Sequence, residues 1–137
     1  VYLAPSDYHR VHMPYNGRLS DATYIPGDLF SVNPKTVEEI PGLYAKNERL
    51  VFNFKTDKGN MMIVMVGAAV VAGIKPFWRE TAFEPRIYKK EKMNFYLNKG
   101  DEIGLFEMGS TVILLLSNRF EFSLRKNERV FFGQSIS

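Results

Sequence analysis

The chain has 137 residues, of which 45% are hydrophobic and 24% are charged. This length and composition suit one folded domain, expected to span 1–137, with a hydrophobic core of its own. The formal net charge of +3 is mild and dispersed, so it could favour an anionic surface but does not indicate nucleic acid. Cysteine is absent, which excludes disulfides, thiolate zinc sites and a cysteine nucleophile.

The first residues, 1–5, show neither an initiator methionine nor a signal or targeting pattern. We therefore expect the chain to be part of a longer protein, with a region missing upstream. The longest apolar run, 61–74, is interrupted by Gly67 and Gly73 and is shorter than the roughly 20 residues of a membrane-spanning helix. We interpret this run as buried strand.

The first predicted elements are one short helix and one hairpin. The helix signal covers 36–43, after Pro34 and up to the Pro41-Gly42 pair. A β-rich run at 50–54, a polar turn at 55–60 and the apolar run from 61 predict the hairpin. The next stretch, 75–98, has the weakest pattern and is interpreted as a long loop, with a solvated charged cluster at 89–92.

The remaining predicted elements are strands. Residues 103–106 predict a short strand, and the continuous run 111–116 predicts a strand buried on both faces. Residues 120–124 alternate with period two, and 130–132 are expected to pair back after a charged turn at 125–129. Many short strands with little helix predict an all-β sandwich or barrel.

Both histidines of the chain, His9 and His12, lie three residues apart in one segment, 7–14. Histidine titrates near neutral pH and is the usual proton carrier. On a regular strand this spacing directs the two rings to opposite faces, so a shared site requires a bend or a cleft. Two hydrogen-bonded structural histidines are the alternative. No third ligand with metal spacing accompanies them, so a zinc site is not expected.

A second candidate site is the Gly109-Ser110 pair, which leads directly into the apolar run. A glycine before a serine can hold an unusual backbone conformation that brings the hydroxyl close to the glycine carbonyl carbon. Attack there would form a five-membered ring and then an ester, an N-to-O acyl shift. An ordinary turn before a strand is the alternative.

Taken in order, several segments resemble the phosphatidylserine decarboxylase family. They cover nearly the whole chain: 2–14 with the histidine motif, 26–34, 47–49, 66–68, 99–104, 108–111 with the Gly-Ser-Thr processing site, and 130–134. Met108 stands where leucine is more usual, a volume-conserving change. The resemblance implies an all-β barrel–sandwich hybrid fold built from short antiparallel strands.

The resemblance also implies a self-processing lyase. Ser110 would attack the carbonyl of Gly109, and β-elimination and hydrolysis would then release ammonia and leave a pyruvoyl group at position 110. Two fragments, 1–109 and 110–137, would stay together in one core. The ketone would accept the electrons left when carbon dioxide departs, so neither pyridoxal phosphate nor a metal is expected.

The resemblance assigns roles to three further residues. His12 would be the base that activates Ser110, and His9 would position the substrate or handle its proton during decarboxylation. The aspartate that orients the processing histidine in the family lies upstream of this segment, and Asp7 is not expected to replace it. Ser31 resembles a residue near the substrate phosphate, with a turn-capping serine as the alternative.

The implied reaction converts phosphatidylserine to phosphatidylethanolamine and carbon dioxide. A lipid substrate implies association with a membrane surface, cytoplasmic in bacteria or inner in organelles, through an N-terminal amphipathic region missing here. The family also tends to form homodimers. Two alternatives remain: a biotinyl or lipoyl carrier module modified at Lys92, and a pyruvoyl enzyme acting on a soluble amino acid.

Overall fold

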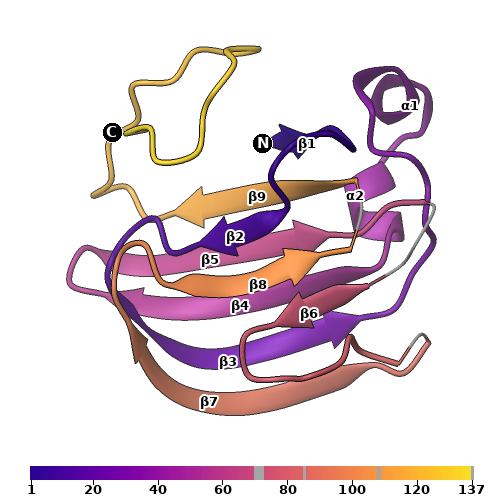
Figure 1. The fold of residues 1–137 in the computed structure, drawn as a ribbon. Helices are drawn as coiled ribbons and strands as arrows, with labels where there is room; N and C mark the ends of the chain where they lie inside the picture. The colour runs from indigo at the N-terminus through magenta and orange to yellow at the C-terminus, as the bar shows by residue number, and fades with distance from the viewer. Residues whose placement is uncertain (70–72, 85, 108, 137) are drawn as a thin grey trace.

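The chain, described here in a computed structural model over residues 1–69, 73–84, 86–107 and 109–136, forms two antiparallel sheets packed face to face (Figure 1). The larger sheet has the order β1 (Tyr2–Leu3), β9 (Ser110–Leu116), β5 (Gly59–Val66), β4 (Arg49–Thr56), β3 (Gly17–Ile25) and β7 (Lys89–Leu97). The smaller sheet has the order β2 (Arg10–His12), β8 (Glu102–Phe106) and β6 (Ile74–Pro76). The predicted all-β class is confirmed.

The main hydrophobic core lies between the two sheets. Strand β5 shows why, because Met61, Ile63 and Met65 face this core while Val64 and Val66 face a smaller cluster on the other side. Alternation on both faces explains why the run is continuously apolar. Two short helices, α1 (Pro34–Glu39) and α2 (Leu43–Lys46), contribute to the smaller cluster.

The predicted helix is only partly correct, because two short helices take the place of one. Asn33 caps α1 by accepting a hydrogen bond from the Thr36 N–H at 2.9 Å, so Pro34 is the first helical residue rather than a residue before the helix. Gly42 then adopts a left-handed φ of 69° and separates α1 from α2. Proline at the first position and glycine between the helices fit their usual places.

The predicted hairpin is confirmed as β4 and β5, which pair from Arg49↔Val66 to Thr56↔Gly59. The apolar run leaves the sheet after Val66, and its residues 70–72 lie outside the described part of the chain. Among the described residues, no helix has the length and apolar character needed to cross a membrane.

The predicted loop over 75–98 is wrong. Residues 89–97 form β7, an edge strand that pairs with β3 (Figure 1). Its lysines are exposed, as is common on edge strands, where charge discourages pairing with another chain. Trp78 donates a hydrogen bond to Glu91 at 3.0 Å and packs against Phe52, so it connects β7 to the core.

Two strand predictions near the C-terminus are also wrong. Within the described residues 117–136, neither 120–124 nor 130–132 is a strand. The predicted charged turn is present at Arg125–Glu128, and a second turn at Phe131–Gln134 replaces the last predicted strand. This C-terminal segment lies outside both sheets (Figure 1), so its alternation has no neighbouring strand to pair with. Strand β9 itself is buried only at Ser110 and Thr111, with Leu115 53% exposed, so burial on both faces is wrong.

Glu48 is a carboxylate buried at the start of β4, only 5% exposed. Burial raises the pKa of Glu48, and interaction with the Tyr24 hydroxyl opposes that shift only in part. A raised pKa in the folded state means that the contribution of Glu48 to stability is complete below its unfolded pKa. That contribution is lost as the pH rises through the folded pKa.

Glu48→Gln should therefore raise the free energy of unfolding at pH 7, because the neutral amide avoids burying a charge. The gain should shrink towards zero near pH 4, where the carboxyl is protonated in both states. Urea unfolding at the two pH values measures it, with exposed Glu80→Gln as the control. A variant less stable than the parent at pH 7 would contradict this assignment.

Candidate active site

The histidine motif lies beside the strand that leads to Gly109-Ser110. Strand β2 pairs antiparallel with β8, with Val11 opposite Gly104 and a bulge between Val11 and His12. The Phe106 N–H donates to the His9 carbonyl at 2.9 Å, which extends this pairing towards the candidate cleavage site. The bulge interrupts the strict alternation assumed from sequence, so the two rings need not lie on opposite faces.

Ser110 opens β9 and is held by the beginning of the chain. Leu3 pairs with Ser110, and the Val112 N–H donates to the Val1 carbonyl at 2.8 Å. The Ser110 side chain is fully buried, and its hydroxyl has no hydrogen-bond partner among the described residues. A buried hydroxyl without a partner is costly, and Thr111, the next residue of β9, shares this state.

Gly109 has a φ of +30°, on the side of the Ramachandran map that favours glycine. A Cβ placed on it would meet only Pro5 Cγ, at 4.0 Å. The backbone conformation rather than crowding therefore requires glycine here. The unusual conformation expected from the Gly-Ser pair is confirmed for the glycine. Met108 lies outside the described residues.

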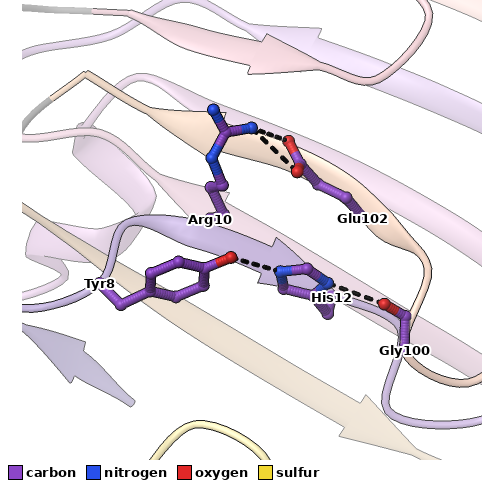
Figure 2. A network of polar contacts seen from close by, with 5 residues as sticks. All are labelled: Tyr8, Arg10, His12, Gly100 and Glu102. Atoms are coloured by element: carbon purple, nitrogen blue, oxygen red, sulfur yellow. Dashed lines mark hydrogen bonds and ion pairs between the residues drawn. The ribbon is translucent and has the colours of Figure 1, made fainter.

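His12 has a partner at each ring nitrogen (Figure 2). Its Nδ1 lies 2.8 Å from the carbonyl oxygen of Gly100, and its Nε2 lies 2.9 Å from the Tyr8 hydroxyl. A carbonyl oxygen only accepts, so Nδ1 carries the proton. In neutral His12 the lone pair is then on Nε2, where it accepts from Tyr8. Gly100 thus sets a tautomer suited to a base at Nε2.

His9 contacts Pro5, in the segment between β1 and β2. Its Nε2 is 3.3 Å from the Pro5 carbonyl oxygen, and Pro5 in turn lies next to Gly109. The Nδ1 of His9 is buried and has no partner among the described residues. The structure records no hydrogen bond between Ser110 and either histidine within those residues.

Asp7 does not orient His12, as expected. Its carboxylate accepts from the Ala4 N–H at 2.8 Å and so closes a turn in the segment between β1 and β2. Arg10, between the histidines, forms an exposed ion pair with Glu102 at 2.8 Å (Figure 2). This pair joins β2 to β8, although exposed pairs of this kind contribute little stability.

Ser31 lies in the loop before α1, where its hydroxyl accepts from the Asn33 side-chain amide at 2.9 Å. Asn47 anchors this loop from a fully buried position. Its amide donates to the carbonyls of Phe30 and Gly67 at 2.7 and 2.9 Å, and its oxygen accepts from the Phe30 N–H. Because β5 ends just before Gly67 and pairs with β9, Asn47 connects the Ser31 loop to the strand that carries Ser110.

A mainly apolar cavity of about 400 Å³ lies beside His12 and β9. Val112 and Leu114 line it from β9, and Phe122 and Leu124 line it from the C-terminal segment. Val112 and Leu114 follow Ser110 at two-residue steps, so they share its face of the strand. The cavity therefore begins one step along β9 from the candidate nucleophile.

Four residues that contribute to this site were not predicted from the sequence. Tyr8 and Gly100 bind His12, Asn47 anchors the Ser31 loop, and the Phe132 ring packs 4.8 Å from both the Tyr8 and His12 rings. All four lie in segments that carry the family resemblance, at 2–14, 47–49, 99–104 and 130–134, but the resemblance assigned them no role. The contacts of Phe132 join residues 120 and 124 positions apart in the chain. No group of three or more potential metal ligands occurs in the part of the chain that the structure describes.

Residues 1–137 match the family model described as phosphatidylserine decarboxylase. The chain belongs to the phosphatidylserine decarboxylase family. Similar relatives are named phosphatidylserine decarboxylase proenzyme. That of Shewanella sediminis is 50% identical over 125 residues, and that of Shewanella loihica is 48% identical over 125. That of Pseudoalteromonas atlantica is 47% identical over 121 residues.

The match covers most of this chain but less than half of each relative. The aligned region is 85% of this chain and 44% of the protein from either Shewanella species. For the Pseudoalteromonas atlantica protein the shares are 82% and 42%. The name proenzyme fits a self-processed member of the phosphatidylserine decarboxylase family.

The geometry predicts that neutral His12 is protonated at Nδ1 and unprotonated at Nε2. Two-dimensional ¹⁵N–¹H NMR of the imidazoles, on unsplit Ser110→Ala protein at a pH where His12 is neutral, measures this tautomer. Tyr8→Phe should keep the tautomer, because Gly100 still accepts from Nδ1, but should shift the Nε2 resonance. A dominant Nε2–H form would contradict the Gly100 contact.

Proposed function

We propose that the chain carries the reactive centre of a phosphatidylserine decarboxylase, a carboxy-lyase that makes its own pyruvoyl group from Ser110. One observation carries the proposal: a fully buried, unpartnered serine hydroxyl follows a glycine of positive φ, beside the histidine motif. An ordinary turn would not need to leave a buried hydroxyl unpaired at this position.

Self-processing begins when Ser110 Oγ attacks the carbonyl carbon of Gly109. The bond from that carbon to the Ser110 nitrogen breaks, and an ester to Oγ takes its place. Nε2 of His12 is suited to take the hydroxyl proton and return it to the departing nitrogen. Removal of the Ser110 Cα proton then expels the Gly109 carboxylate, and water releases ammonia from the new terminus.

The residues around position 110 fit the resulting pyruvoyl group. The position is fully buried, so the group would lie within the core of the protein. When formed, the group supplies a carbonyl that accepts the electron pair left by departing carbon dioxide. Strand β9 pairs with β5 from Val66↔Thr111 to Met61↔Leu116, which would hold fragment 110–137 against 1–109 after splitting.

We assign the remaining site roles by position. His9, with a buried Nδ1 and with its Nε2 near the Pro5 carbonyl, would position the substrate or return a proton to it. The apolar cavity beside His12 offers room for part of a lipid. Ser31 would lie near the substrate phosphate, held through the Asn47 anchor of its loop.

The proposed substrate is phosphatidylserine and the product phosphatidylethanolamine. A lipid substrate requires the full protein to meet a membrane surface, and we propose a peripheral association through a region upstream of this segment, in a bacterial cytoplasmic membrane or an organellar inner membrane. A homodimer of split protomers is part of the same proposal.

The carrier alternative is not favoured. Lys92 lies in the middle of β7 opposite Asp21, whereas a carrier lysine needs an exposed hairpin tip. The second alternative, a pyruvoyl enzyme for soluble amino acids, is not favoured either, because the relatives are named for phosphatidylserine.

Ser110→Ala in the full-length protein should abolish both splitting and decarboxylation, because no other oxygen replaces Oγ. Intact mass spectrometry measures splitting, and release of carbon dioxide from phosphatidylserine measures activity. The unchanged parent should give two masses divided between residues 109 and 110, the smaller blocked at its N-terminus. Decarboxylation by the alanine variant would refute the mechanism.

The two histidines should separate the two reactions. His12→Ala should leave the chain unsplit, because Ser110 loses its base. His9→Ala should still split but lose turnover by about 10²-fold or more, the usual effect of removing a proton-transfer group. Gel electrophoresis and activity on the same samples compare them, and equal splitting in both variants would overturn the division of roles.

A further inference from the structure

We propose that Tyr8 holds His12 in the unsplit chain and must release it before Ser110 can be activated. This inference rests on the proposed function of Ser110 and His12. It makes Tyr8 a positioning residue that sets the rate of self-processing, through a hydrogen bond to the same nitrogen that the serine proton needs.

Only one nitrogen of His12 can act as a base. The Gly100 carbonyl lies 2.8 Å from Nδ1 and can only accept, so Nδ1 keeps its proton. Nε2 is therefore the basic atom of the neutral ring. No alternative tautomer can serve while the Gly100 contact persists.

The basic nitrogen of His12 is already hydrogen-bonded to Tyr8. The Tyr8 hydroxyl lies 2.9 Å from Nε2, and the two rings stack with centroids 5.8 Å apart (Figure 2). Ser110, in contrast, has a buried hydroxyl with no partner among the described residues. Tyr8 therefore occupies the nitrogen that would have to accept the serine proton.

The Tyr8 side chain can rotate away from His12 because it lies at the surface. Its side chain belongs to the segment between β1 and β2, and the residue is 47% exposed. Phe132, 68% exposed itself, packs 4.8 Å from both the Tyr8 and His12 rings. Rotation of the phenol into solvent therefore breaks one hydrogen bond and two partly exposed ring contacts, and it opens no buried cavity.

The test compares self-processing of full-length protein carrying Tyr8→Phe with the unchanged protein. The phenylalanine ring keeps the stacking but frees Nε2, so splitting should be about two- to tenfold faster, the factor that a typical single hydrogen bond represents. Tyr88→Phe is the matched control, because Tyr88 is 60% exposed and its hydroxyl makes no hydrogen bond within the described residues. Freshly translated protein sampled over time gives the rate.

A spectroscopic measurement separates this role from general loosening of the fold. In unsplit Ser110→Ala protein, Tyr8→Phe should move the His12 Nε2 ¹⁵N resonance and leave His9 unchanged, whereas Tyr88→Phe should move neither. Splitting at an unchanged or lower rate in Tyr8→Phe would overturn the inference while leaving the proposed function intact. Absence of splitting in the unchanged protein would instead refute the proposed function.

Discussion

The pairing of β9 on both of its edges is the constraint on which the site depends. Tyr2 and Val66 lie opposite Thr111 on its two sides, and Leu3 lies opposite Ser110. The backbone that follows the Gly109–Ser110 bond is therefore fixed by hydrogen bonds that do not involve that bond. Strand β1 is also the start of the segment that carries both histidines, so one short pairing positions nucleophile and candidate bases together. Breaking the Gly109–Ser110 peptide would leave these ladders in place, because they join β9 to its neighbours rather than to residue 109.

Ser110 stores unfavourable energy at this point, beside a glycine whose positive φ other residues rarely adopt. Gly109 has a positive φ, and Ser110 buries a hydroxyl that has no partner in the described chain. A buried, unpaired hydroxyl alone costs about 1–3 kcal/mol. Costs of this kind persist where the surrounding structure fixes the geometry, and they gather at functional sites. Pairing of β9 on two sides provides that support, and attack on Gly109 would relieve the unpaired hydroxyl by converting it to an ester.

The sequence predicts those parts of the fold that depend on local pattern. The hairpin of β4 and β5, strand β8 and strand β9 follow from β-rich runs separated by polar turns. Strand β7 was not predictable from its charge-rich start, because its neighbours lie in β3, some 70 residues earlier in the chain. The prediction for 120–124 is wrong for the opposite reason. The segment has the alternating pattern of a strand, but no strand in the described residues lies beside it. The site residues divide in the same way between local and long-range signals. His9, His12 and Ser110 could be singled out by their residue type. Tyr8, Gly100 and Phe132 contribute through contacts that only the folded chain brings together.

The environment of His12 separates two tasks that one carboxylate performs in a serine–histidine–aspartate triad. Such a carboxylate fixes the tautomer, and its charge also stabilises the imidazolium that forms when the histidine takes a proton. The Gly100 carbonyl, which accepts from Nδ1, can perform the first task. It is neutral, so it lacks the charge–charge attraction by which a carboxylate stabilises the imidazolium. The β2–β8 pairing and the turn at Gly100 therefore supply the orientation of the ring, whereas the charge that a triad carboxylate provides is not supplied by Gly100.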